Sequence, residues 1–120
     1  MTLKDCYIAM GGNYEDVFSR LRSERMIEKF VLKFLDDGSF DLLGRSMAAG
    51  AGEEAFRAAH TIKGMCQNLG FTRLEKSSSQ MTETLRHGDM AGAQDIFGCV
   101  REDYEHTVAA ICAYRDTLLR

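Results

Sequence analysis

The chain contains no proline, and it also lacks any long apolar run. Because proline breaks helices and starts turns, its absence favours an all-helical chain with short connections. No apolar stretch approaches the roughly 20 residues that span a bilayer, and the N-terminus lacks the basic-then-apolar pattern of a signal peptide. We therefore expect a cytoplasmic protein without a membrane segment.

Basic charge is not in excess either. The 120 residues carry 15 Lys and Arg against 18 Asp and Glu, a formal net charge of −3, so nothing global attracts nucleic acid or an anionic membrane. A glycine-rich nucleotide loop is missing, which argues against an autokinase. Hydrophobic residues make up 45% and charged residues 28%. This composition and length fit one globular domain, residues 1–120.

The cysteines show neither CxxC spacing nor a compact framework, which argues against a zinc site or a disulfide scaffold. We expect them to be reduced and mostly buried, because a free thiol on an apolar helix face acts as a small hydrophobe. The four are Cys6, Cys66, Cys99 and Cys112.

Glycines and predicted caps divide the chain into seven segments with apolar residues three and four apart, and alternation of period two never persists. Each segment predicts a helix. Thr2, Asn13, Ser23 and Asp89 are predicted N-caps, and Ser39 opens the fourth helix. The expected helices, caps included, span about 2–10, 13–21, 23–35, 39–49, 53–69, 72–87 and 89–118.

The last four helices are long and joined by short turns, which predicts an antiparallel four-helix bundle. Residues 1–22 form additional short helices that cover one end or edge, and 23–120 hold the bundle and its flanking helix. Three apolar faces are predicted in particular. Their residues are Leu3, Tyr7 and Ile8; Leu74, Ser78, Met81 and Leu85; and Ala93, Ile96, Val100, Tyr104, Thr107, Ile111, Tyr114 and Leu118.

One polar face stands out, on the segment 53–70. Its apolar stripe is Ala55, Ala59, Ile62, Cys66 and Leu69. At about 100° per residue, His60 points roughly 140° away from the centre of that stripe. Lys63, Gly64 and Gln67 fall within roughly 60° of His60. An imidazole, an ammonium, a missing side chain and an amide thus share one surface that a partner can approach.

The run Ala59-His60-Thr61-Ile62-Lys63-Gly64, followed by Asn68-Leu69-Gly70, resembles the signature A-H-x-[LI]-K-G of histidine-containing phosphotransfer (HPt) domains. The resemblance extends over roughly Ser39 to Arg120, and we expect it to include the helix from Ser23 to Asp36. It implies that His60 accepts a phosphoryl group, since a neutral imidazole attacks phosphorus without a separate base. Lys63 would offset the charge of the phosphoryl oxygens. Gly64 would leave room for the partner, and Gln67 could donate to the phosphate or to the partner.

The resemblance implies a monomeric phosphorelay intermediate. It would exchange its phosphoryl group with an aspartate of a response-regulator receiver domain, and a hybrid histidine kinase is a further expected partner. We expect no cofactor on this chain, because the Mg²⁺ for transfer would come with the receiver.

The sequence departs from the family at Thr82. HPt domains commonly place a Glu or Gln there to orient the histidine ring, and a threonine hydroxyl is shorter. Ser78, Ser79 or a water molecule are the other candidates. Phe56, one turn before His60, has two interpretations: a docking patch shared with Tyr14 or Phe18, or ordinary packing under the N-terminal helices.

Two other functions remain open. One is a scaffold that binds receivers without transfer. The other is a metal-binding bundle that uses His87 and His106, each four residues after a glutamate (Glu83 and Glu102). We expect these two histidines to form solvated ion pairs with the glutamates instead, and hence no metal site.

Overall fold

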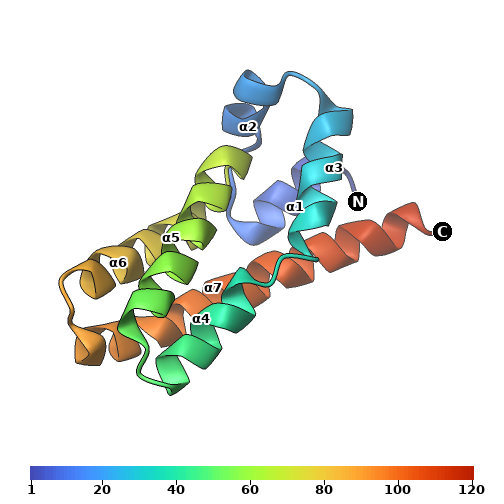
Figure 1. Cartoon of the computed structure of the whole chain (residues 1–120). Coiled ribbons are helices and arrows are strands. Elements are labelled where there is room, and N and C mark those ends of the chain that lie inside the picture. The colour runs from blue at the N-terminus through green and yellow to red at the C-terminus, as the bar shows by residue number, and fades with distance from the viewer.

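The computed structural model describes residues 1–120, and every regular element in it is an α-helix (Figure 1). The predicted all-α class is confirmed, and each of the seven predicted segments forms one helix. They are α1 (Leu3–Met10), α2 (Tyr14–Leu21), α3 (Glu24–Phe34), α4 (Ser39–Ala48), α5 (Gly52–Leu69), α6 (Thr72–Arg86) and α7 (Met90–Leu118).

Polar caps fix the starts of four helices. Thr2 forms a capping box with Asp5 at the start of α1. Asn13, Ser23 and Asp89 accept a backbone N–H at the starts of α2, α3 and α7. The first N–H groups of a helix have no partner within it, so these side chains decide where each helix begins. All four are caps that the sequence predicts.

Helices α4 to α7 form the predicted antiparallel bundle (Figure 1). Helix α5 packs against both α4 and α6, and α6 packs against α7. Stacked aromatic rings join α4 to α7: the Phe40 ring centroid lies 4.1 Å from that of Tyr104 and 5.9 Å from that of Phe97. Helix α5 is therefore held from both sides, and one face of it remains for solvent.

The 29 residues of α7 span the molecule, whose longest extent is 43 Å. Beyond the bundle, α7 supports the N-terminal helices, which gather at one end (Figure 1). The Cys6 thiol of α1 donates to the Ala110 carbonyl at 3.5 Å. The Tyr114 hydroxyl donates to Glu28 of α3 at 2.8 Å. The short helices thus cover one end of the bundle, as predicted.

Two residues predicted to face inward are exposed: Ile8 by 78% and Leu118 by 47%. Helix α1 buries Cys6 and Met10 beside Leu3 and Tyr7, a stripe that leaves Ile8 on its flank. Leu118 lies in the last turn of α7, which projects past the neighbouring helices in Figure 1. No helix combines the length and apolar character that crossing a membrane requires.

All four cysteines are free, but only two of them are buried. Cys6 and Cys66 lie in the core, where burial raises the pKa of both thiols, that of Cys6 to about 11. Cys112 is half-buried and Cys99 is exposed. The expectation that most would be buried is wrong for Cys99, because it lies on the solvent side of α7.

Candidate functional site

The candidate site lies on the solvent-exposed side of α5, and the opposite side of this helix is buried in the core. The five predicted inward residues are buried, and Ala58 joins them. Small alanines on that side let the neighbouring helices approach closely. His60 lies on the exposed side, as the helical phase predicts. The buried residues of α5 are Ala55, Ala58, Ala59, Ile62, Cys66 and Leu69.

The last turn of α5 is fastened by residues from the N-terminal helices. The Arg20 guanidinium donates to the carbonyls of Gln67 at 2.7 Å and Asn68 at 2.9 Å. The Tyr7 hydroxyl donates to the Leu69 carbonyl at 2.6 Å. The last carbonyls of a helix have no hydrogen-bond donor within it, so Arg20 and Tyr7 supply the missing donors. Helices α1 and α2 therefore help to fix the helix that carries His60.

Gly70 ends α5 in the left-handed conformation, with φ +71°. Its carbonyl accepts the Asn13 backbone N–H at 2.8 Å. A Cβ at Gly70 would lie 2.6 Å from the Asn13 carbonyl oxygen. Glycine is needed here both for its backbone angle and for this close approach, so this part of the signature is structural.

The His60 ring stacks on Phe56, with centroids 5.9 Å apart and planes inclined by 14°. The guanidinium of Arg86, from α6, also lies over the Phe56 ring, 4.9 Å from its centroid. Arg86 is in turn paired with Glu83 at 3.2 Å. The His60 ring accepts or donates no hydrogen bond within the protein, so stacking is the contact that orients it.

This arrangement corrects the docking patch proposed for Phe56 with Tyr14 or Phe18. Those two rings stack on each other at 5.9 Å, in the helix beside the far end of α5. The alternative, packing under the N-terminal helices, is also wrong, because the partners of Phe56 are His60 and α6. The helical phase places Phe56 on the His60 face correctly. Nothing in the sequence near Phe56 predicts the cation–π contact with Arg86 of α6.

Lys63, Gly64 and Gln67 complete the exposed face. Lys63 is half-buried and pairs with no carboxylate within 4.0 Å, and Gln67 is exposed. Gly64 lies inside regular helix, and a Cβ built on it meets no atom within 4 Å. The surface next to His60 is therefore open on the Gly64 side and carries an unpaired ammonium on the other.

Thr82 does not belong to this surface. Its side chain is fully buried, and its hydroxyl donates to the Ser78 carbonyl one turn earlier at 2.7 Å. Ser78 is also buried and donates to the Leu74 carbonyl at 2.7 Å. Both hydroxyls thus serve their own helix, and neither reaches a ring on the exposed face. Of the three hydroxyl candidates, only Ser79 is accessible to solvent.

The other two histidines lie outside α5, His87 at the end of α6 and His106 in α7, and their expected ion pairs do not form. The carboxylate of Glu83 pairs with Arg86, and that of Glu102 with Arg73 at 3.9 Å. His87 instead contacts the backbone carbonyl of Glu83 at 2.7 Å. No three His, Cys, Asp or Glu side chains gather where they could hold a metal ion.

The comparisons with known proteins agree with this geometry. A family model described as the Hpt domain matches residues 26–110, a segment that includes α4, α5 and α6 and with them His60, Lys63 and Gly64. Searches of curated proteins and of solved structures gave no match. The family match covers well over half of the chain, and the structure is a helical bundle with an exposed histidine. The chain therefore belongs to the Hpt domain family, the helical bundles that carry phosphoryl groups on histidine in two-component phosphorelays.

Proposed function

We propose that His60 is the residue that carries the phosphoryl group, and that it exchanges this group with an aspartate of a receiver domain. The proposal is supported above all by the position of its ring. His60 is exposed on α5, within the matched segment, and an unpaired lysine and an open glycine follow it one helical turn further on. Neither His87 nor His106 lies beside such a pair of neighbours.

The transfer step needs only a neutral imidazole on this chain. A ring nitrogen of His60 attacks the phosphorus of the receiver's aspartyl phosphate. The N–P bond forms as the P–O bond to the aspartate breaks, and the carboxylate leaves with the bonding electron pair. The proton on the second ring nitrogen stays on the imidazole. In the opposite direction, the aspartate carboxylate attacks and the imidazole leaves.

Three neighbours would support this step. The Lys63 ammonium, one helical turn from His60, stabilises negative charge on the phosphoryl oxygens in the transition state. Gly64 leaves the space through which the receiver's aspartate approaches in line. Phe56 holds the imidazole plane by stacking at 5.9 Å, so it acts as a positioning residue. Gln67 lies on the same exposed side, two turns along, within reach of the receiver.

The partners follow from the reaction. A response-regulator receiver supplies the aspartate, and we place the Mg²⁺ that phosphoryl transfer needs on the receiver's side of the complex. A hybrid histidine kinase that ends in a receiver would present the same chemistry to His60. This chain then serves as the carrier between two aspartates.

A transfer assay tests the proposal. Purified full-length chain is mixed with a phosphorylated receiver and Mg²⁺, and phosphate on each protein is followed with time. His60→Gln should remove all transfer to this chain, and its helicity should stay unchanged because the side chain is exposed. His87→Gln and His106→Gln are matched controls, since both also replace exposed histidines. They should transfer like the wild type.

Two results would contradict the proposal. Transfer to the His60→Gln chain would assign the phosphoryl group to another residue. A wild-type chain that binds the receiver tightly but never acquires phosphate would instead identify a scaffold.

A further inference from the structure

A second basic residue of α5 flanks His60. Arg57 lies three residues before His60, and Lys63 lies three residues after it. At about 100° per residue, these two side chains leave the helix roughly 60° to either side of His60. Both positions are about one turn away, where Cβ atoms are about 5–6 Å from that of the histidine. The imidazole therefore has one cation on each side.

The direction of the His60 side chain brings its ring over the turn that contains Arg57. Side chains of a helix tilt toward its N-terminus and cover the preceding turn. The His60 ring does so, because it stacks on Phe56, four residues earlier, with centroids 5.9 Å apart. Arg57 directly follows Phe56. In the other direction, the row of Arg57 continues into Gly64, which has no side chain. The guanidinium can therefore reach a phosphoryl group on the His60 ring without a side chain of this row in its way.

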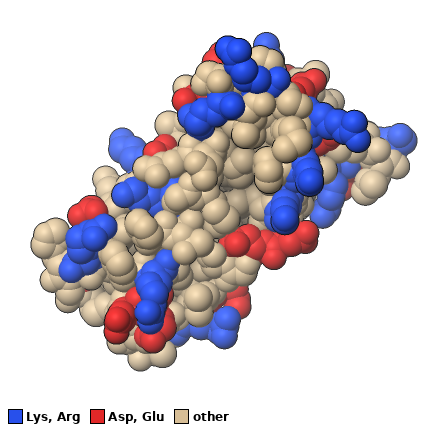
Figure 2. Space-filling model, turned by 45° about the horizontal axis from the view of Figure 1, so that its top comes forward, with Lys and Arg blue, Asp and Glu red and all other residues tan.

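The carboxylate beside Arg57 holds it only weakly. The Arg57 guanidinium lies 3.6 Å from an oxygen of Glu54, too far for a hydrogen bond. The two side chains are 64% and 54% exposed, and an ion pair in water contributes little to stability. Such pairs are frequent on a protein surface, and basic and acidic side chains touch in the lower left of Figure 2. Arg57 is thus free to exchange Glu54 for a stronger partner.

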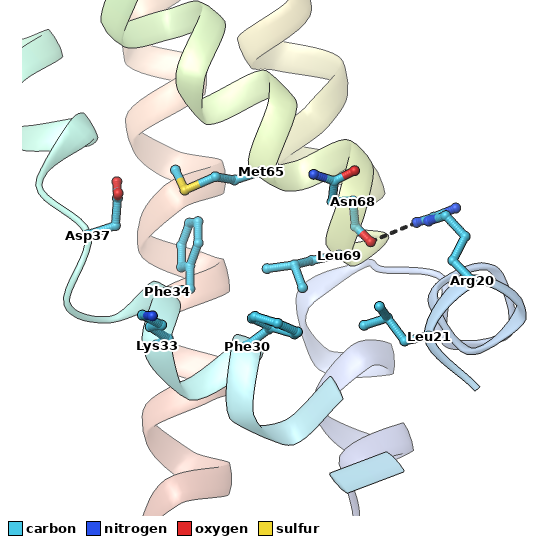
Figure 3. Close-up of a pocket in the computed structure, with 9 residues that line it drawn as sticks. All are labelled: Arg20, Leu21, Phe30, Lys33, Phe34, Asp37, Met65, Asn68 and Leu69. Carbon is cyan, nitrogen blue, oxygen red and sulfur yellow. Dashed lines mark hydrogen bonds between the residues drawn. The ribbon is translucent and has the colours of Figure 1, made fainter. Parts of the chain in front are cut away.

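Other arginines that contact α5 are more firmly engaged. Arg86 donates to the Glu83 carboxylate at 3.2 Å. Arg20 donates to two carbonyls at the far end of α5. Figure 3, a close-up of the pocket beside that end, shows the bond to Asn68. The two cations that flank His60 have no comparable bond, so they remain available to a negative charge that arrives there.

We propose that Arg57 exchanges Glu54 for the phosphoryl group of phosphorylated His60, and so stabilises the phosphorylated chain. A phosphoryl group carries a charge of about −1.5 to −2, more than the carboxylate it replaces. The planar guanidinium can also bind two of its oxygens at once. No covalent bond changes in this exchange, in which one ion pair breaks and another forms. The inference rests on the proposed function, because it assigns the group that holds the phosphate after transfer.

Arg57 and Lys63 then affect different quantities. Lys63 stabilises the transition state, so its loss slows transfer in both directions. Arg57 stabilises the phosphorylated product, so its loss changes the equilibrium constant for exchange with the receiver. This constant is the ratio of phosphorylated to unphosphorylated chain, divided by the same ratio for the receiver, with all four species as free proteins. It does not depend on how tightly the chain and the receiver bind each other, so it separates a contact with the phosphate from a contact with the receiver.

Three variants and two matched controls test this assignment. Arg57→Ala removes the guanidinium, Arg57→Lys keeps the charge without the planar fork, and Glu54→Gln removes the competing carboxylate. Arg115→Ala and Asp116→Asn are the controls, because this pair in the last turn of α7 is similarly loose, 3.7 Å apart. Each full-length protein is brought to equilibrium with Mg²⁺ and a receiver that exchanges phosphate with the wild type. The four species are quantified, and the ³¹P chemical shift of each phosphorylated chain is recorded.

Arg57→Ala should lower the equilibrium constant about threefold to tenfold, the range for an exposed contact between ions. It should also move the ³¹P shift, because a cation leaves the phosphoryl oxygens. Arg57→Lys should give an intermediate constant. Glu54→Gln should raise the constant about twofold, because Arg57 then gives up no partner. Both controls should match the wild type. Arg57 and Glu54 are exposed, so circular dichroism should show unchanged helicity.

Three results would overturn the assignment. The first is an Arg57→Ala chain that matches Arg115→Ala in equilibrium constant and ³¹P shift, which would make Arg57 a solvated surface residue. The second is a loss in Glu54→Gln as large as that in Arg57→Ala, which would make the pair a structural unit of α5. The third is slower transfer of Arg57→Ala in both directions at an unchanged constant, which would place Arg57 on the transition state or the receiver. Failure of the proposed function looks different, because the wild type itself would then acquire no phosphate from any receiver.

Discussion

Replacing Gly64 should make the protein more stable and the transfer slower. A glycine inside a helix costs about 0.5–1 kcal/mol relative to alanine. A Cβ at Gly64 meets nothing within 4 Å, so Gly64→Ala has no clash to offset this gain. The melting temperature of a chain of this size should rise by about 2–4 °C. Thermal unfolding followed by circular dichroism measures it.

Gly64→Gln extends the same change toward the partner. Side chains one helical turn apart have Cβ atoms about 5–6 Å apart, so glutamine would stand beside the His60 ring. The fold should keep its stability, whereas the receiver's aspartate should lose its in-line approach. Misplacement of about 1 Å costs on the order of a hundredfold in rate, so we expect transfer to fall by tenfold or more.

Gly98 supplies the matched control. It also lies inside a helix, in α7, and a Cβ built on it likewise meets nothing within 4 Å. Gly98→Gln should leave the transfer rate unchanged. The reasoning fails if Gly64→Gln unfolds the protein, because Gly64 would then serve packing. It fails equally if Gly64→Gln transfers phosphate as fast as Gly98→Gln.

Three further predictions concern other parts of the molecule. Lys63→Ala should slow transfer by about tenfold to a thousandfold without weakening receiver binding. Rapid-quench kinetics at saturating receiver measure this rate, and a wild-type rate would contradict the role given to Lys63. Phe56→Ala should free the His60 ring and so lower the transfer rate at saturating receiver. The NMR signals of the His60 ring should show increased mobility. If the mobility of the ring is unchanged, Phe56 has no positioning role. Burial raises the pKa of the Cys6 thiol to about 11 from an ordinary value of 9.0. The unfolded chain therefore loses this proton first, so stability should fall as pH rises from about 9 to 11. Urea titrations should show a shallower fall for Cys6→Ala, and an equal fall would assign the alkaline loss to other groups.

The helices and the His60 face could be predicted from the sequence because both depend on local spacing. Thr2, Asn13, Ser23 and Asp89 cap the helices they were expected to cap, since a cap is a bond to a backbone N–H two or three residues away. The exposed position of His60 follows from phase within a single helix.

One error arises where the outcome depends on a distant partner, and another where a family pattern was preferred to the helical phase. Ile8 is exposed because α1 buries Cys6 and Met10 and bonds to α7 through the Cys6 thiol, a choice that the spacing within eight residues leaves open. Thr82 was matched to an orienting glutamine through alignment with a family pattern. Its phase, four residues after the buried Ser78, already places it in the core.

Contacts between helices were beyond the reach of sequence patterns. Nothing near Arg20 indicates that it caps α5 some 47 residues later. The cation–π contact between Arg86 and Phe56 likewise depends on how α5 and α6 align. The surroundings of the His60 ring, and the hydrogen bonds that join α2 to the end of α5, therefore required the three-dimensional structure.

The most direct test of the central claim is to locate the phosphate on the wild-type chain. The full-length protein is phosphorylated by its receiver, digested at neutral to alkaline pH, and mapped by mass spectrometry together with ³¹P NMR of the intact protein. We predict a single acid-labile phosphoramidate, on the peptide that contains His60. Acid-labile phosphate on His87 or His106, or only acid-stable phosphate on a hydroxyl, would contradict the account.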